Sequence, residues 1–386
     1  MTKNQTPGIG VRRPVRSRRG ALIMLASTVA LPVLAACTRS DRRGESREKP
    51  SAAADGKGIP DTRAVGGVPT SRETQRSPFP MTSVGLSWTG PEEGIRIRFL
   101  DASGTPSSSW TPVAAACPCG RDAARGERRT AVSRALVPAD DARAYQVEYP
   151  EDIDILSGVV MDTVHGPERP RPTPAASRRK PSRKSRPGLD DLGVIGRAEW
   201  GADETKVTAR PAFSDAQALT VHHTVTTNDD RDPASTIRAI FELHAVQNDW
   251  GDIGYHFLVD SSGRVYEGRA SGNSGLPAHN EAAQVVTGFH TAGFNTGNIG
   301  VALLGDMSRQ APSAAARRSL AQLLATLSGL HDLDPLSEIT YVNPVGGARR
   351  KTSPLNGHGT WTSTECPGTE TDIEELRKAV AEELAL

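Results

Sequence analysis

The spacing of hydrophobic and polar residues changes along the chain and divides it into regions. Over residues 78–165, short stretches such as 94–100 and 144–149 alternate apolar with polar residues, and Gly, Pro, Ser and Asp separate them. Alternation with a period of two between regular turn signals is typical of strands that bury one face. We therefore predict a small all-β domain, similar to a sandwich, over residues 78–165.

Residues 188–386 follow a different pattern, in which apolar strands alternate with helical periodicity. The predicted strands lie at residues 218–225, 254–259, 264–267 and 298–305, with a hairpin turn at 261–263. Three helices are predicted. The first begins at Asp232, which can cap it, with Pro233 at its first position, and the second spans residues 312–330. The third begins at a capping box formed by Thr371 and Glu374. The fold class expected for residues 188–386 is α/β, with a mixed central β-sheet flanked by helices.

Two further segments have the composition of connections. Residues 38–77 are rich in Arg, Gly, Ser, Ala and Pro and contain few large apolar side chains, so we predict a disordered tether there. Residues 166–187 are dense in Pro, Arg, Lys and Ser, which favours an extended basic linker.

The first 37 residues have the pattern of an export signal. Basic residues precede an uncharged apolar run at 21–36, which is too short to favour a membrane span. Arg18 and Arg19 resemble a twin-arginine signal, and residues 34–37 resemble the lipobox of bacterial lipoproteins, so Cys37 would be the lipidated first residue of the mature chain. A plain cleaved signal remains the alternative. We expect an exported, extracytoplasmic protein, either anchored to the membrane by lipid or secreted to the cell wall.

The total charge gives no reason to expect a polyanionic partner. Lys and Arg number 46 and Asp and Glu number 45, which leaves a formal net charge of +1. The basic residues at 178–186 are interpreted as solvated linker, although attraction to anionic wall polymers is the alternative. We expect no nucleic acid partner, membrane contact only through a lipid anchor at Cys37, and a monomer.

The cysteines leave one thiol without an obvious pair. Apart from Cys37, the chain contains Cys117, Cys119 and Cys366, an odd number for an exported protein. Cys117 and Cys119 lie one residue apart and could pair with each other in a tight turn. Cys366 would then be unpaired, and zinc coordination would use its thiolate.

Histidines supply the other candidates for a metal site. His222 and His223 are adjacent on a predicted strand, so their side chains point to opposite faces and only one faces a site. His358 and Cys366 follow later. Two imidazoles and a thiolate fill three positions of a tetrahedral zinc site and leave the fourth for water, as a catalytic zinc requires. A purely structural zinc site would need a fourth protein ligand, for which no motif is found.

Seven motifs of residues 188–386 together resemble the zinc amidase family that includes peptidoglycan recognition proteins and the amidase-type lysozymes of bacteriophages. The motifs are Arg-Ala-Glu-Trp-Gly-Ala at 197–202, Val-His-His-Thr at 221–224, Trp-Gly-Asp-Ile-Gly-Tyr-His-Phe at 250–257, Val-Tyr-Glu-Gly-Arg at 265–269, Gly-Phe-His at 288–290 with Asn295, Asn-Ile-Gly-Val at 298–301, and His358 with Cys366 and Pro367. They occur in the family's order.

The resemblance implies roles for individual residues. It makes His222, His358 and Cys366 the Zn²⁺ ligands and gives Tyr255 and Thr364 catalytic roles. His223 and His256 are expected to be structural, and His244 and His290 are candidates to line the cleft.

The implied function is hydrolysis of the amide bond between N-acetylmuramic acid and L-alanine of peptidoglycan by a zinc-activated water. The alternative is a module that recognises peptidoglycan with weak or no catalysis. Gly359 and Thr360 stand where the commoner family pattern has Arg and Asp, which puts details of specificity in doubt. Family members without the cysteine bind and do not cleave, so Cys366 favours the enzyme.

Overall fold

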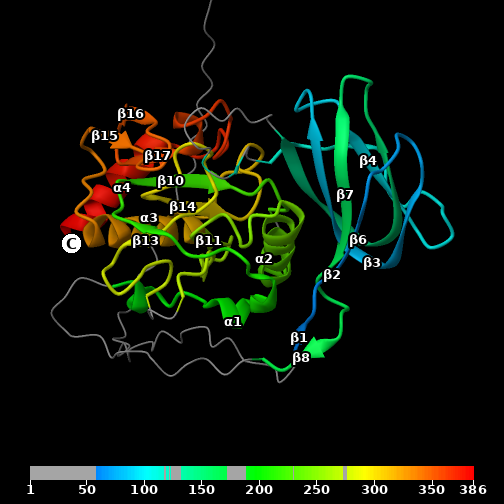
Figure 1. The fold of residues 1–386 in the computed structure, drawn as a ribbon, viewed down its shortest axis with the longest axis horizontal. Helices are drawn as coiled ribbons and strands as arrows, with labels where there is room; N and C mark the ends of the chain where they lie inside the picture. Colours follow the sequence, from blue (N-terminus) through cyan, green and yellow to red (C-terminus); the bar gives the residue numbers. More distant parts are fainter. Residues whose placement is uncertain are drawn as a thin grey trace, which may run out of the picture. The chain divides into compact units, whose positions relative to one another are not determined.

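The structure is a computed structural model that describes residues 58–116, 119–120, 122, 132–171, 188–228, 230–272 and 276–386 (Figure 1). The predicted export signal with Cys37, the tether up to residue 57, Cys117 and most of the basic linker lie outside the described residues. Among the helices in the described ranges, none combines the length and apolar character needed to span a bilayer.

The first described region is an antiparallel β-structure. Its strands are β1 (Ile59–Pro60), β2 (Arg63–Gly67), β3 (Gln75–Thr89), β4 (Arg96–Leu100), β5 (Thr111–Pro112), β6 (Ser133–Glu148), β7 (Asp154–Asp162) and β8 (Glu168–Arg169). Six of them form one sheet in the order β2-β7-β3-β6-β4-β5, and β1 pairs with β8. The pairing of β3 with β6 and with β7 contains register shifts, which bend a sheet. The six strands thus form one continuous hydrogen-bonded sheet that bends at these irregularities.

The β-structure begins earlier and ends later than the sequence pattern predicts. Residues 58–77, assigned to the tether, contain β1, β2 and the first residues of β3, and β8 lies in the predicted linker. Pairing between distant strands explains why residues 63–67 form a strand. Their strand, β2, runs antiparallel to β7, and the side chain of Arg63 forms an ion pair with the buried Asp162. Hydrogen bonds between backbones leave no signature in hydrophobicity, so composition alone suggested a tether.

The second region has the predicted α/β architecture. Its strands are β9 (Phe213–Ser214), β10 (Ala218–His223), β11 (Phe257–Val259), β12 (Val265–Glu267), β13 (Val285–Val286), β14 (Asn298–Leu303), β15 (Ile339–Val342), β16 (Arg349–Thr352) and β17 (Leu355–Gly357). The central sheet has the order β12-β11-β14-β10-β17, with β12 antiparallel to β11 and the other pairs parallel. The predicted mixed central sheet is therefore confirmed.

Helices cover this sheet. They are α1 (Arg197–Trp200), α2 (Pro233–Glu242), α3 (Ala314–Leu330) and α4 (Ile373–Ala385), with the 3-10 turns η1 (Leu189–Leu192), η2 (Glu204–Lys206) and η4 (His358–Thr360) and a π-helical turn η3 (Leu243–Gln247). The side chain of Asp232 caps α2 as predicted, by accepting a bond from the Ser235 amide. The cap of α4 is Asp372, one residue later than predicted. Thr371 instead donates its hydroxyl to the carbonyl of Pro367.

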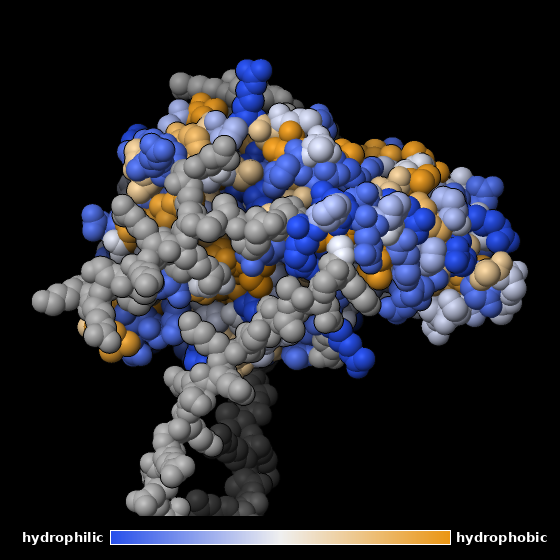
Figure 2. Space-filling model, turned by 90° about the horizontal axis from the view of Figure 1, so that it is seen from below, coloured by the Kyte–Doolittle hydropathy of each residue, from blue (hydrophilic) through white to orange (hydrophobic). Residues whose placement is uncertain are grey.

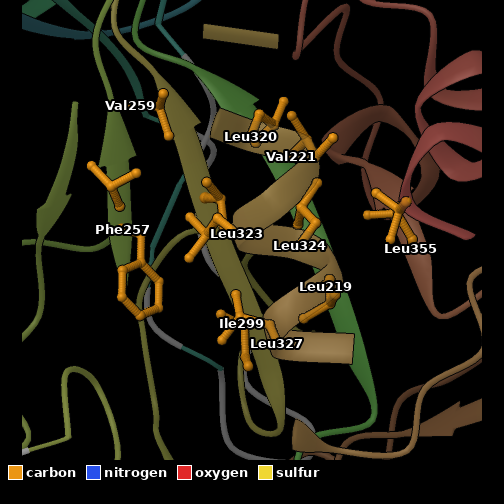
Figure 3. Packing of buried hydrophobic residues seen from close by; sticks show 14 of the residues in the cluster. Leu219, Val221, Phe257, Val259, Ile299, Leu320, Leu323, Leu324, Leu327 and Leu355 are labelled. Carbon is orange, nitrogen blue, oxygen red and sulfur yellow. The ribbon is translucent and has the colours of Figure 1, made fainter. Parts of the chain in front are cut away.

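Alternation along β10 separates two cores. Leu219 and Val221 face α3, where its leucines pack against β11 and β14 (Figure 3). Thr220 and His222 point to the other face, because successive side chains of a strand alternate. The core on that side contains Ile237 and Phe241 of α2.

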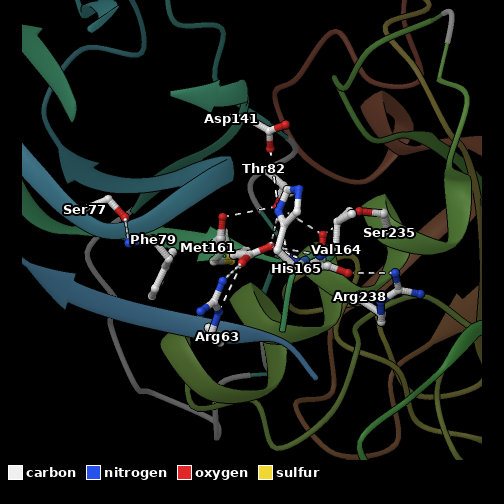
Figure 4. A network of polar contacts seen from close by, with 12 residues as sticks. Arg63, Ser77, Phe79, Thr82, Asp141, Met161, Val164, His165, Ser235 and Arg238 are labelled. Atoms are coloured by element: carbon white, nitrogen blue, oxygen red, sulfur yellow. Dashed lines mark hydrogen bonds and ion pairs between the residues drawn. The ribbon is translucent and has the colours of Figure 1, made fainter. Parts of the chain in front are cut away.

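The six-stranded sheet of the first region packs against α2. Its residues Val159 and Met161, from β7, belong to the same hydrophobic cluster as Ile237 and Phe241 of α2. A polar network lies beside this contact: Arg238 of α2 donates to the carbonyl of Thr163, and the hydroxyls of Thr163 and Ser235 share a hydrogen bond (Figure 4). On the face shown in Figure 2, hydrophilic residues spread over the surface and hydrophobic residues occupy smaller areas between them.

Candidate metal centre

Neighbouring strands bring the three predicted ligands together. His222 lies near the end of β10, and His358 directly follows β17, the parallel neighbour of β10. Cys366 lies in the next loop. The candidate ligand atoms of His222, His358 and Cys366 all lie within 4.8 Å of one another, and all three residues are buried. The His222 and His358 rings have centroids 4.6 Å apart, and Cys366 Sγ lies 3.6 Å from His222 Nδ1.

Close backbone contact holds the His358 turn against the Cys366 loop. The amide of Gly359 donates to the carbonyl of Cys366 over 2.8 Å. A Cβ added at Gly359 would lie 2.8 Å from the carbonyl oxygen of Thr364, which is closer than a Cβ atom approaches another heavy atom in a folded protein. The glycine that departs from the commoner family pattern therefore has a packing reason, since a larger residue would push the two ligand segments apart.

Hydrogen bonds determine which nitrogen of His222 is available to a metal. His290 Nε2 lies 2.9 Å from the carbonyl oxygen of Asn298, which can only accept, so this nitrogen carries the hydrogen. Burial lowers the pKa of His290 to about 3, so the ring is neutral and its Nδ1 accepts. His222 Nε2, 2.9 Å from that atom, is then the donor. The unprotonated Nδ1 of His222 is left on the side of Cys366.

The electrostatics also fit a cation. Burial, and then the neighbouring His358 and His290 rings, lowers the pKa of His222 well below its usual value. Burial lowers the pKa of His358 to about 3. Both imidazoles are therefore neutral at physiological pH, the form in which histidine binds metals. Two neutral imidazoles and one thiolate are a donor set that Zn²⁺ prefers.

Tyr255 and Thr364 lie beside this cluster. Tyr255 is 3% exposed, and its ring centroid lies 5.3 Å from that of His222. The hydroxyl of Thr364 accepts from the amide of Cys366 over 3.3 Å. Thr364 and Cys366 border a cavity of about 610 Å³, which is also lined by Glu92 and Glu93 between β3 and β4. Of the three candidate ligands, Cys366 borders this cavity.

The other histidines have mostly structural partners. His223 is on the opposite face of β10 from His222, and its Nδ1 accepts from the amide of Met307. His256 is fully buried and bonded at both nitrogens, to the Val286 carbonyl and the Gly300 amide. His244 Nδ1 accepts from the Gly254 amide, and its ring lies 5.5 Å from that of Tyr255.

His290, a candidate to line the cleft, is instead fully buried beside His222. Its ring packs over Gly300 of β14, where a Cβ would lie 2.5 Å from the ring carbon Cγ. The motif at 288–290 drew attention to His290 but gave no indication of its partner. That partner is 68 residues away in the sequence.

The chain is similar to one family of known proteins. The family described as N-acetylmuramoyl-L-alanine amidase matches residues 212–369, a stretch that includes His222, Tyr255, His358, Thr364 and Cys366. The match covers less than half of the chain. We refer below to residues 188–386 as the amidase domain.

Relatives include both amidases and recognition proteins. The N-acetylmuramoyl-L-alanine amidase of Sus scrofa is 28% identical over 176 residues, which are 45% of this chain and 25% of that protein. Peptidoglycan-recognition protein SC2 of Drosophila melanogaster is 28% identical over 179 residues, which are 46% of this chain and 80% of that protein. The chain thus spans about a quarter of the length of the mammalian amidases that it matches. Among solved structures, the amidase LysC from Clostridium intestinale is 22% identical with a TM-score of 0.33, over 48% of this chain and 95% of that one.

The hydrogen bond from His222 to His290 leads to a first prediction for the amidase domain. His290→Ala should weaken zinc binding by about 10- to 100-fold, because a partner that fixes the tautomer and orientation of a metal ligand contributes about that much. His290→Gln should recover part of the loss, since an amide can accept from His222 and donate to Asn298. Zinc affinity is measured by competition with a chromophoric chelator.

Thermal unfolding of the metal-free proteins serves as the control for this pair. If His290→Ala and His290→Gln bound zinc as tightly as the unchanged protein, the orienting role of His290 would be refuted.

Proposed function

We propose that the chain is a zinc-dependent N-acetylmuramoyl-L-alanine amidase, which hydrolyses the amide bond between N-acetylmuramic acid and L-alanine of the peptidoglycan stem peptide. The observation that carries this proposal is the buried cluster of His222, His358 and Cys366, whose candidate ligand atoms lie within 4.8 Å of one another. Cys366 of this cluster and the neighbouring Thr364 border a cavity. Three protein ligands leave a fourth zinc position for water, and the family match covers all three.

His222, His358 and Cys366 would hold the metal, and a bound Zn²⁺ would supply a nucleophilic water at neutral pH and polarise the substrate carbonyl. The protein's own contribution is positioning. His290 fixes the ring of His222, and the Gly359 contact keeps His358 and Cys366 at one place.

Tyr255 is suited to stabilise charge on the substrate. Its ring lies against His222 in an apolar cluster that contains Trp250 and Cys366. A phenol in such surroundings donates a stronger hydrogen bond to a developing oxyanion than it would in water. Thr364 has a hydroxyl at the cavity wall, where it can orient the attacking water or the tetrahedral intermediate.

The same proposal includes the place of action. The export signal at residues 1–37, with lipidation of Cys37, would deliver the amidase domain of residues 188–386 to peptidoglycan outside the cytoplasmic membrane. The β-region is the part of the chain that contains β1 to β8, and residues 78–165 of it are predicted as a separate domain. It would be exported together with the amidase domain, and the whole chain would be a monomer.

The test uses the mature chain and purified sacculi. We expect release of stem peptides with new L-alanine amino termini, loss of release with a chelator, and recovery with zinc. Mass spectrometry of the products identifies the bond. Cleavage at another bond, or activity that survives complete removal of zinc, would contradict the proposal.

A second candidate is recognition of peptidoglycan without cleavage. It is favoured by Cys119 of the β-region, whose Sγ lies 3.8 Å from the Tyr255 hydroxyl and restricts access to it. Binding to sacculi without new amino termini, by protein that contains zinc, would support this alternative.

A further inference from the structure

A short segment of the β-region reaches into the amidase domain. Its described residues are Cys119, Gly120 and Asp122, between β5 and β6. Cys119 is a free thiol, only 7% exposed, in the hydrophobic cluster that contains Tyr255. Its Sγ lies 3.8 Å from the Tyr255 hydroxyl oxygen. The segment therefore contacts the group that we propose stabilises charge during hydrolysis.

The carboxylate of Asp122 fixes the segment to the amidase domain. Its Oδ1 accepts from the backbone amide of Asn295 over 3.1 Å and from the Asn295 side-chain amide over 2.8 Å. Its Oδ2 accepts from the Asn343 side chain over 2.7 Å, from the Thr296 hydroxyl over 3.1 Å and from the Thr296 amide over 3.3 Å. The carbonyl of Gly120 accepts from the Asn295 side chain as well.

The donors that surround Asp122 form a built site. Asn295 and Asn343 are fully buried and Thr296 is 5% exposed. Asn295 is held in place by its own Oδ1, which accepts from the amides of His290 and Thr291. Converging amide and hydroxyl donors satisfy a carboxylate, and leaving such buried donors unpaired destabilises the fold. These donors thus require an acceptor, and a carboxylate matches their number and directions.

We propose that Asn295, Thr296 and Asn343 form a carboxylate-binding subsite of the substrate cleft, and that Asp122 occupies it as an internal ligand that keeps Cys119 over Tyr255. The inference rests on the proposed function, because its ligand is a carboxylate of the acidic stem peptide. The side-chain oxygen of Asn295 accepts from the backbone amide of His290, and the ring of His290 is bonded to His222. A substrate carboxylate that takes over these donors displaces Asp122 and uncovers Tyr255.

The reactivity of Cys119 reports displacement without any need for catalysis. In the full-length zinc-loaded chain, we expect Asp122→Ala to raise the rate of Cys119 alkylation by iodoacetamide at least about 10-fold, because a buried thiol becomes exposed. The isosteric Asp122→Asn should change the rate in the same direction. Fragment ions separate Cys119 from Cys117 in the same peptide. The matched control is Asp154→Ala, an exposed aspartate of β7, which should leave the rate unchanged.

The ligand arm uses a soluble muramoyl tripeptide with free carboxylates and the same peptide with its carboxylates amidated. The free acid should speed alkylation of Cys119 in the unchanged protein, and the amidated form should not. Equal effects of both peptides, or no faster alkylation in Asp122→Ala and Asp122→Asn, would overturn the proposal. Faster alkylation of the variants together with the free-acid effect, but no amide hydrolysis, would support the subsite and refute the proposed function.

Discussion

Replacement of Cys366 by alanine should abolish hydrolysis of peptidoglycan. A thiolate at Cys366 would supply the negative charge of the metal site, because His222 and His358 are neutral. The Sγ of Cys366 lies 3.6 Å from His222 Nδ1. Without it, two imidazoles remain to hold the metal. We expect activity to fall by at least about 10³-fold, because loss of the metal removes several kcal/mol of transition-state stabilisation and each 1.36 kcal/mol is a factor of ten. Stem-peptide release and zinc content per chain are measured together.

Cys119→Ala is the matched control for zinc content. It also removes a buried thiol, yet Cys119 is outside the cluster of metal-ligating groups found in the described residues. It should therefore bind zinc as the unchanged protein does. Hydrolysis that persists in Cys366→Ala at the unchanged rate would disprove the proposed metal site.

Tyr255→Phe should lower kcat by roughly 10²–10³-fold, which is the usual effect of removing one donor to a developing oxyanion. The substitution retains the ring that packs against His222 and His244 and removes only the hydroxyl. KM and zinc content should change little, because the donor acts on charge that develops in the transition state. Steady-state kinetics on a soluble muropeptide measure kcat and KM separately.

Tyr266→Phe provides the comparison for the tyrosine variant. Tyr266 lies on β12 and is buried to about the same extent as Tyr255. Its hydroxyl donates a hydrogen bond to Asp260. Loss of this hydrogen bond should reduce stability by about 1 kcal/mol and leave kcat unchanged. A fall in KM and kcat together for Tyr255→Phe, or no fall in kcat at all, would argue against the oxyanion role.

Local patterns predicted the elements of the amidase domain well. Continuous apolar runs gave β10 and β14, and the pair Asp232-Pro233 gave the start of α2. The cap of α4 was displaced by one residue because Thr371 and Asp372 can both cap a helix, and the carboxylate of Asp372 makes the bond. Side-chain patterns do not decide between adjacent residues of similar capping ability.

The β-region was harder to predict because its order depends on pairing between distant strands. The ladder between β2 and β7 joins residues almost a hundred positions apart, and its hydrophobic content is low. The contact of Asp122 with Asn295, 173 residues later, has no local signature at all. In the metal cluster, the resemblance supplied candidate ligands, but the tautomer of His222 depends on His290 and Asn298, whose positions only the folded sheet defines.

The separation of His222 from Cys366 by 144 positions links metal binding to folding. An unfolded chain offers these ligands on remote segments and binds zinc weakly, whereas the folded sheet holds β10 and β17 side by side. Free zinc at about 100 times its dissociation constant would then add about 2.7 kcal/mol to the free energy of unfolding. Under the proposed function, scarcity of zinc would therefore lower both the rate of hydrolysis and the resistance to unfolding.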